Sequence, residues 1–225
     1  MNEFPEGVLS VVSDTWDYWK VLTEYLPVLK DQIMARNGTL VVRPDSGDPV
    51  KIIVGDPEAE PGSPEFKGTF TILDEIFGST INEKGYKVLD SHIGAIYGEA
   101  ITPVRAEAIC SGLAKKGFVP TVVFGIGSYT YQCQTRDTYG MAVKATAGVV
   151  NGEVREIFKD PKTDNGSKKS AKGYLAVYKD INGEYSLFQQ MDINAVKNCE
   201  FEKVFCDGDL YRDQSLADIR ELLRN

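Results

Sequence analysis

The sequence is short of the residues that build metal centres and disulfide frameworks. It contains one histidine, His92, and four widely spaced cysteines with no Cys-x-x-Cys pair. Structural zinc sites and disulfide-bonded scaffolds need such residues at close, repeated spacings, so neither is expected. Unpaired cysteines of this kind fit a reducing environment, and we expect a cytoplasmic protein.

Long apolar runs are also lacking. No stretch approaches the roughly 18 consecutive apolar residues that a membrane span needs. Residues 1–6 show no basic region followed by an apolar one, so no secretory signal is expected. The net charge of −8 argues against nucleic acid as a general partner. These features exclude membrane and nucleic-acid functions at the level of the sequence.

One segment departs from the acidic average. Residues 136–172 hold eight basic and five acidic side chains, a local charge of +3. A basic site on an acidic protein suits a small anion such as phosphate better than a polymer. Lys162 and the cluster Lys168, Lys169 and Lys172 lie among Asn, Gly and Ser, and we interpret them as part of a solvated loop.

A charged turn directly follows the apolar run 39–42. It reads Arg43-Pro44-Asp45-Ser46-Gly47-Asp48-Pro49. In α/β folds, ligands bind at the carboxyl ends of the parallel strands, where this turn would lie. An arginine there can grip a planar or anionic group, and an aspartate can accept hydrogen bonds from sugar hydroxyls. The alternative is an Arg–Asp pair that only closes a turn.

Four units of strand, loop and helix follow one another along the first part of the chain. The first combines a strand at 9–13 with a helical region that begins near Asp14 or Thr15, is split in two by Pro27 and ends at Asn37-Gly38. The other strands are expected at 39–42, 93–97 and 119–124, with helices at 70–77 and 102–116. Alternating patterns then predict strands at 141–150, 154–158, 174–178 and 185–189, with hairpin turns at Asn151-Gly152 and Asn182-Gly183, and a final helix at 215–223.

The number of units limits the fold. A closed (β/α) barrel usually takes eight such units, and four would leave strand edges unpaired. The pattern therefore predicts an α/β fold that is either an open doubly wound sheet or part of a larger assembly.

Several short motifs, in order, resemble the C-terminal half of the nicotinamide phosphoribosyltransferases. These enzymes make nicotinamide mononucleotide and pyrophosphate from nicotinamide and phosphoribosyl pyrophosphate. The similarity runs over nearly the whole chain, and the Arg-Pro-Asp form favours the nicotinamide branch over the nicotinate enzymes. The motifs are Ser10-Val11-Val12-Ser13-Asp14, the 43–49 turn, Lys84-Gly85-Tyr86-Lys87, Tyr97-Gly98-Glu99, Phe124-Gly125-Ile126-Gly127, Thr135-Arg136-Asp137 and Phe158-Lys159-Asp160-Pro161.

The resemblance implies a fold and a division of the chain. We expect a partial (β/α) barrel of about four βα units, followed by antiparallel β-hairpins and a C-terminal helix. Residues 1–140 would form half of the barrel. Residues 141–225 would form an extension packed on it.

The resemblance also implies roles for individual residues. Arg43 would lie beside the nicotinamide ring and Ser10 near its carboxamide, with Asp14 supporting the catalytic centre from behind. Asp45 would hold the ribose hydroxyls, with Gly98 and Glu99 next to them. The backbone at Gly127 and Ser128 would receive the nucleotide phosphate. The basic residues expected around phosphate and pyrophosphate are Arg136, Lys144 and Lys159, with structural ion pairs as the alternative.

Three departures from the family pattern accompany these matches. Glu99 stands where the family usually has aspartate, and the glycine run reads Gly-Ile-Gly-Ser-Tyr. The family's catalytic histidine, which ATP phosphorylates, lies upstream of the Ser-Val-Val-Ser-Asp motif. His92 is no substitute, because it is expected at the start of a strand, opposite the edge that bears the site.

We therefore expect a C-terminal portion or split subunit of a nicotinamide phosphoribosyltransferase that is inactive alone. Mg²⁺ is expected with phosphoribosyl pyrophosphate, and ATP in the complete enzyme. A complementary N-terminal half and a homodimer are the expected protein partners. The alternatives are a non-catalytic nucleotide- or phosphate-binding module and a truncated reading frame.

Overall fold

The computed structural model describes residues 1–134, 136–139, 141–166 and 168–224. The chain divides into two compact units. The first comprises Met1–Lys144 and Lys159–Ser170, and the second comprises Ala145–Phe158 and Ala171–Asn225.

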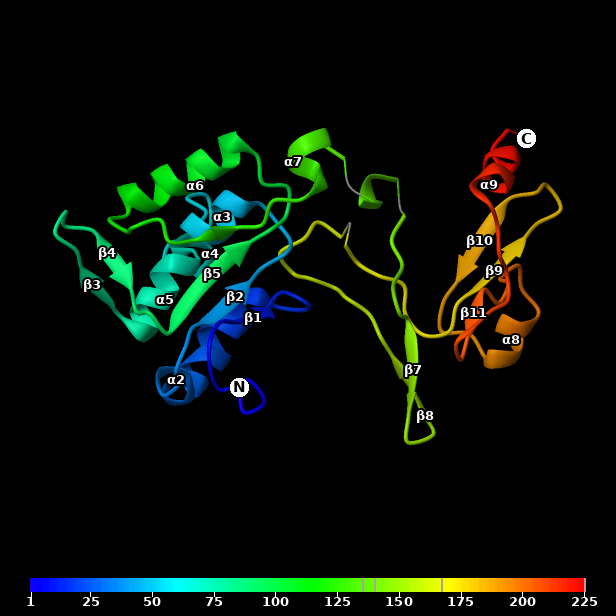
Figure 1. The fold of residues 1–225 in the computed structure, drawn as a ribbon, viewed down its shortest axis with the longest axis horizontal. Coiled ribbons are helices and arrows are strands. Elements are labelled where there is room, and N and C mark those ends of the chain that lie inside the picture. The colour runs from blue at the N-terminus through cyan, green and yellow to red at the C-terminus, as the bar shows by residue number, and fades with distance from the viewer. Residues whose placement is uncertain (135, 140, 167, 225) are drawn as a thin grey trace. The chain divides into compact units, whose positions relative to one another are not determined.

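A parallel sheet of four strands forms the centre of the first unit (Figure 1). The strands are β1 (Leu9–Val12), β2 (Leu40–Arg43), β5 (Ile93–Tyr97) and β6 (Val123–Phe124), in the order β1-β2-β5-β6. Leu40 of β2 is buried between Leu9 of β1 and Ile93 of β5 in the register. All four carboxyl ends meet at one edge of the sheet.

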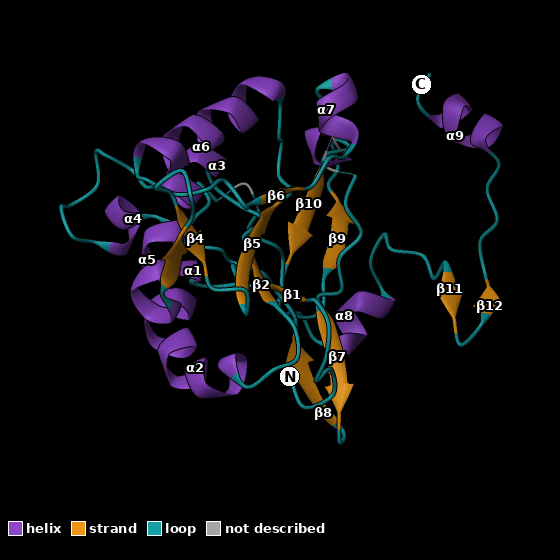
Figure 2. Ribbon diagram, turned by 60° about the vertical axis from the view of Figure 1, so that its left-hand side comes forward, coloured by secondary structure: helices purple, strands orange, loops and turns teal. Residues whose placement is uncertain are grey.

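Helices cover one side of this sheet (Figure 2). Two of them begin with an aspartate or threonine cap followed by proline at the first helical position, where the missing N–H costs nothing. Asp48 accepts hydrogen bonds from Val50 N and Lys51 N, and Thr102 accepts one from Arg105 N. The helices of the unit are α1 (Tyr18–Lys20), α2 (Leu26–Met34), α3 (Pro49–Val54), α4 (Pro64–Lys67), α5 (Thr69–Phe77), α6 (Pro103–Lys115) and α7 (Ser128–Gln132).

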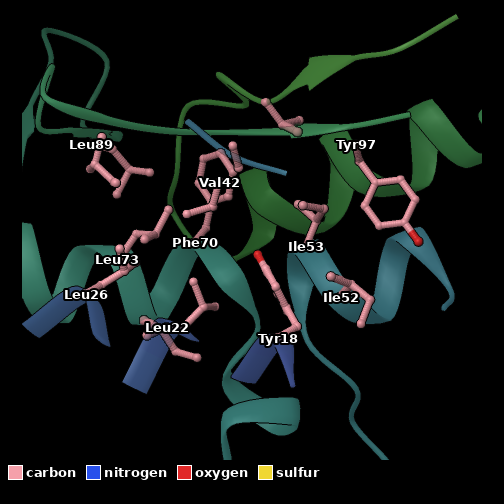
Figure 3. Close-up of a cluster of buried hydrophobic side chains, with 14 of the residues drawn as sticks. Tyr18, Leu22, Leu26, Val42, Ile52, Ile53, Phe70, Leu73, Leu89 and Tyr97 are labelled. Carbon is pink, nitrogen blue, oxygen red and sulfur yellow. The ribbon is translucent and has the colours of Figure 1, made fainter. Parts of the chain in front are cut away.

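The core lies between these helices and the sheet. Figure 3 shows Val42 of β2 and Tyr97 of β5 facing the side chains of α3 and α5. Phe70, Leu73 and Ile53 are almost fully buried there. Because α5 places apolar side chains at 70, 72, 73 and 77, one of its faces is continuous with the core.

Pro27 does not split the first helical region as the sequence predicted. α1 continues into a π-helix, Val21–Tyr25, and then directly into α2, whose second residue is Pro27. The Leu26 N–H donates to Val21 O, five residues back. A proline ring clashes with the carbonyl four residues before it, and the wider π turn relieves that clash without ending the helix.

The last strand of the sheet is shorter than the predicted strand at 119–124. The residues before it pair elsewhere: Lys87 N donates to Gly117 O, and Val119 N donates to Lys87 O. Their partner belongs to a hairpin that the sequence did not predict, β3 (Ser79–Ile81) and β4 (Lys87–Leu89). Only Val123 and Phe124 remain to extend the parallel sheet.

The second unit consists of small antiparallel elements. The predicted hairpins β7–β8 and β9–β10 are present, and Asn151 and Gly152 both take positive φ in the first turn, as a tight hairpin turn requires. The elements are β7 (Ala147–Val150), β8 (Glu153–Glu156), β9 (Ala176–Lys179), β10 (Tyr185–Phe188), α8 (Ile193–Lys197), β11 (Phe205–Cys206), β12 (Asp209–Leu210) and α9 (Leu216–Leu222).

The predicted α/β class is confirmed, with a parallel sheet followed by antiparallel hairpins. Among the described residues the sheet is open, with β1 and β6 as its edges. No helix in the described part of the chain is both long and apolar enough to span a bilayer.

A glycine in α6 generates a prediction about packing. A Cβ built on Gly112 would lie 2.8 Å from Val54 Cγ1 of α3. In an exposed helix, Gly→Ala stabilises by about 1 kcal/mol. Here we expect Gly112→Ala to lower the free energy of unfolding by about 1–3 kcal/mol, because the stiff valine cannot move aside.

Urea unfolding followed by tryptophan fluorescence measures this effect, since both tryptophans, Trp16 and Trp19, belong to the first unit. Val54→Ala provides the matched background, in which Gly112→Ala should become neutral or stabilising. An equal loss in both backgrounds would contradict the close contact.

Candidate functional site

A cavity of about 640 Å³ lies at the carboxyl ends of the parallel strands in the first unit. β2 ends at Arg43, with Asp45 two residues later, and β5 is followed directly by Gly98 and Glu99. The lining residues are Arg43, Asp45, Gly98, Glu99, Ala100, Ile101, Gly127, Ser128, Tyr129, Thr130, Lys144, Lys159 and Lys168. The loops that follow three different strands therefore meet around one hollow.

A buried carboxylate fixes the turn that carries Asp45. Asp14 is fully buried, and its Oδ2 accepts hydrogen bonds from Asp45 N at 2.9 Å and Ser46 Oγ at 2.5 Å. Since the Ser46 hydroxyl has one proton, which it gives to Asp14, the short contact between Ser46 and Thr163 is donated by Thr163. Asp14, which follows β1, and Thr163 thus both bond to the turn.

Tyr97 holds the same turn from β5. Its buried hydroxyl lies 2.8 Å from Ser46 O and 2.7 Å from Gly47 O. Burial raises the pKa of Tyr97, and the carboxylates of Glu99 and Asp14 raise it further, so the hydroxyl stays protonated and remains a donor. Gly47 has φ of 83°, and a Cβ there would meet Thr163 O at 2.6 Å, so only glycine fits.

The glycines after β5 and β6 meet each other. A Cβ on Gly125 would lie 2.8 Å from the Cα of Gly98. This contact brings the end of β6, and with it Gly127 and Ser128, against the end of β5. Gly125 is therefore needed for the close packing of these two strand ends.

Residues 159–166 and 168–170, the described part of a crossing segment, contact the loops after β1, β2 and β5 and bring two lysines to the cavity. Its first half is bound to the β1–α1 loop by hydrogen bonds from Asp160 N to Thr15 O and from Lys162 N to Trp16 O. Lys162 Nζ also pairs with Asp17 at 2.5 Å. Burial raises the pKa of Asp17, but the hydrogen bonds from Lys162 and from Lys20 N, together with the charges of both lysines, outweigh burial and leave that pKa below its ordinary value.

The interpretation of Lys168 as a solvated loop residue was wrong. Its ammonium contacts the Asp45 carbonyl and lies 2.9 Å from Glu99 Oε2 and 3.9 Å from Asp45 Oδ2, with 19% of its side chain exposed. Local composition suggested solvent because the neighbouring residues are small and polar. The tertiary fold instead turns this one side chain inward. Lys162 and Lys169 are exposed, as predicted, and they pair with Asp17 and Asp160 respectively.

The charges in the cavity form a row of alternating sign. Lys159 Nζ lies 3.8 Å from Asp45 Oδ2, and Lys168 lies between Asp45 and Glu99. Among the described residues, neither Arg43 nor Lys144 forms an ion pair. Four cationic side chains thus meet two carboxylates, which leaves the hollow positive and receptive to an anion.

Most of the predicted site residues come together. Arg43, Asp45, Gly98, Glu99, Gly127, Ser128, Lys144 and Lys159 line the cavity. Asp14 lies beneath it, bonded to the turn. What these residues bind stays a prediction.

Two of the predicted residues are not placed at the cavity. Ser10 is exposed on β1 and does not line it. The backbone of Arg136 belongs to the 3₁₀-helix Arg136–Tyr139, and its side chain lies outside what the structure describes. His92 precedes β5, at the opposite end of the strand, with its Nδ1 2.6 Å from Asp90 Oδ1.

Comparison with known proteins places the chain in a family. Residues 1–208 match the nicotinate phosphoribosyltransferase (NAPRTase) family, so the chain belongs to it. It is 50% identical over 227 residues to the nicotinamide phosphoribosyltransferase of Acinetobacter baylyi, covering 98% of this chain and 45% of the relative.

Two further relatives bear the same name. The nicotinamide phosphoribosyltransferase of Mycoplasma pneumoniae is 41% identical over 165 residues, 73% of this chain and 37% of the relative. That of Xanthomonas campestris is 33% identical over 222 residues, 96% of this chain and 44% of the relative. The predicted resemblance is confirmed, and the chain spans less than half the length of these relatives.

The bonded turn generates a prediction about stability. Ser46→Ala removes the hydroxyl that satisfies Asp14 and leaves a buried carboxylate with one fewer donor. We expect the free energy of unfolding of the first unit to fall by about 1.5–3 kcal/mol, as for a hydrogen bond to a charged group. Urea unfolding followed by tryptophan fluorescence measures it.

Ser111→Ala is the control, because Ser111 is exposed on α6, where alanine is a good helix former. It should be neutral or slightly stabilising. A Ser46→Ala variant as stable as this control would show that the turn is held by other contacts.

Proposed function

We propose that the chain provides the ribose- and phosphate-binding portion of a nicotinamide phosphoribosyltransferase. The observation that supports this most is the convergence of Arg43, Asp45, Glu99, Lys159 and Lys168 on one cavity at the strand ends. Its substrates would be nicotinamide and phosphoribosyl pyrophosphate, and its product nicotinamide mononucleotide. We further propose that the four-strand sheet is part of a (β/α) barrel completed by other strands.

The chemistry of the cavity suits this reaction. Glycosyl transfer at the anomeric carbon of ribose builds positive charge on the sugar while pyrophosphate leaves as an anion. Carboxylates such as Asp45 can accept hydrogen bonds from ribose hydroxyls. Cationic groups fixed around the departing pyrophosphate stabilise the charge that develops on it. Lys144, which has no carboxylate partner among the described residues, is available for that purpose, and Arg43, which also has none, would lie beside the nicotinamide ring.

The described residues do not build a magnesium cage. No group of three metal-ligating side chains occurs among them. Mg²⁺ is commonly held by one or two carboxylates together with substrate phosphates. We therefore propose that Mg²⁺ arrives with phosphoribosyl pyrophosphate, and that ATP acts on the complete enzyme outside this chain.

The rest of the enzyme would come from a further polypeptide portion that carries the catalytic histidine. The chain corresponds to only 45% of the Acinetobacter baylyi relative. β1 is an edge strand with Val11 and Val12 nearly half exposed, and an apolar groove of about 670 Å³ lies beside it.

The remaining expectations stay proposals. A homodimer rests on the resemblance alone. A cytoplasmic location rests on the four cysteines, all of which are free thiols.

Binding to the cavity can be measured on this chain. We expect nicotinamide mononucleotide and pyrophosphate to bind with affinities that fall as salt rises. Lys159→Met should weaken pyrophosphate binding tenfold or more, since a charge-assisted hydrogen bond is worth about 1.5–3 kcal/mol. Isothermal titration calorimetry measures both.

Lys169→Met is the matched control, because Lys169 lies on the same segment but pairs with Asp160 in an exposed position. It should leave the affinity within about twofold of the parent. Equal losses in the two variants would indicate a general charge effect rather than a site.

Turnover tests whether the catalytic histidine is supplied by another polypeptide portion. The 225-residue chain alone should form nicotinamide mononucleotide at a negligible rate, because its one histidine, His92, lies at the far end of β5. Co-expression with a polypeptide equivalent to the uncovered part of the Acinetobacter baylyi relative should give a co-purifying, active pair.

Robust turnover by the chain alone would overturn the proposal of a separate catalytic portion. A stable monomer that binds nicotinamide mononucleotide but gains no activity from the companion would favour a non-catalytic binding module instead. Aggregation of the chain alone would favour a fragment with no function of its own.

A further inference from the structure

Glu99 and Lys168 form the closest ion pair in the cavity. Glu99 Oε2 lies 2.9 Å from Lys168 Nζ, whereas the contacts of Asp45 Oδ2 with Lys159 and Lys168 are 3.8 and 3.9 Å. Glu99 follows β5 directly, and Lys168 comes from the crossing segment 159–170. The pair therefore joins the end of a central strand to a segment distant in sequence.

Besides Glu99, only the oxygens of Asp45 contact the Lys168 ammonium among the described residues. The first half of its segment is bonded to the β1–α1 loop, and Ser170 is bonded back to Lys159. Its own ammonium has two kinds of partner, the carboxylate of Glu99 and the oxygens of Asp45. With 19% of its side chain exposed, it is fixed in place rather than free in solvent.

The length of Glu99 matters to this arrangement. An aspartate at the same backbone position would withdraw the carboxylate by one methylene. The ammonium could follow only by leaving the Asp45 carbonyl, which it also contacts. Glutamate, unlike aspartate, can therefore reach Lys168 while Lys168 stays on Asp45.

We propose that Glu99 is a positioning residue: it holds the Lys168 ammonium beside Asp45, where it can receive a phosphate oxygen. The Glu99 carboxylate thus acts mainly through Lys168 rather than on the ribose. The phosphate part of this inference rests on the proposed function, but the ion pair and its dependence on side-chain length do not.

The ion pair can be tested without any ligand. Acetylation of the intact chain by an N-hydroxysuccinimide ester, followed by mass spectrometry, gives the labelling rate of each lysine. Glu99→Asp keeps the charge but shortens the reach, so Lys168 should be labelled about threefold faster or more. Lys169, the next residue, should not change.

Asp160→Asn is the matched control. It removes the partner of Lys169 and should raise only the labelling of Lys169. A Lys168 rate that Glu99→Asp leaves unchanged would overturn the inference. A uniform rise at all lysines would reveal unfolding, and Glu99→Gln, which keeps the side-chain length and removes the charge, would then decide: unchanged Lys168 labelling in that variant also overturns it.

Pyrophosphate binding tests the consequence for the site. Pyrophosphate has no sugar, so a Glu99 that only contacted ribose would leave its affinity unchanged in Glu99→Asp. The positioning role predicts a loss of about threefold or more, and no further loss when Glu99→Asp is added to Lys168→Met.

The results separate the two proposals. If the parent chain binds no pyrophosphate, the phosphate-binding part of the proposed function fails, and the labelling rates alone decide whether Glu99 holds Lys168. If the parent binds but the Glu99 and Lys168 effects add independently, the positioning role fails while the proposed function stands.

Discussion

Asp14 Oδ2 accepts two hydrogen bonds from the turn after β2, one from the Asp45 N–H and one from the Ser46 hydroxyl. A buried carboxylate is costly unless donors satisfy it, so these bonds stabilise one conformation of the turn against the many it could adopt. Tyr97 fixes the same turn from β5. The placement of Asp45, and of the lysines that surround it, follows from this constraint, because Thr163 and Lys168 both bond to the turn.

The two carboxylates of the cavity do not neutralise its four cationic side chains. Lys159 and Lys168 flank Asp45 Oδ2 at 3.8 and 3.9 Å, beyond hydrogen-bond distance, so this carboxylate does not take up their N–H donors. Lys168 is held instead by Glu99 and by the Asp45 carbonyl. Arg43 is exposed at the end of its strand. Fixed cations that no nearby carboxylate fully satisfies bind an incoming anion with little reorganisation, which is what preorganised electrostatic stabilisation requires.

The sequence was sufficient to predict the site where local rules determine it. Arg43 and Asp45 follow a buried strand, and the carboxyl ends of parallel strands must meet at one edge, so their convergence with Glu99 could be expected. Lys168 could not, because its inward direction depends on Asp45 and Glu99, which lie 123 and 69 residues away in the chain. The prediction of a helix break at Pro27 failed because it also depends on tertiary packing. A proline usually ends a helix, but here a π-helix of five residues accommodates the ring, and the burial of Leu22 and Leu26 stabilises the continuous helix.

Near the cavity, β1 is an exposed edge strand of the described sheet. Ser13 and Asp14 turn inward and bond to the β2 turn, while Val11 and Val12 remain nearly half exposed beside an apolar groove. Edge strands of soluble proteins are normally shielded by charge, bulges or a covering element. The exposed valines of β1 and the apolar groove beside it are both explained if one further polypeptide portion packs against this strand.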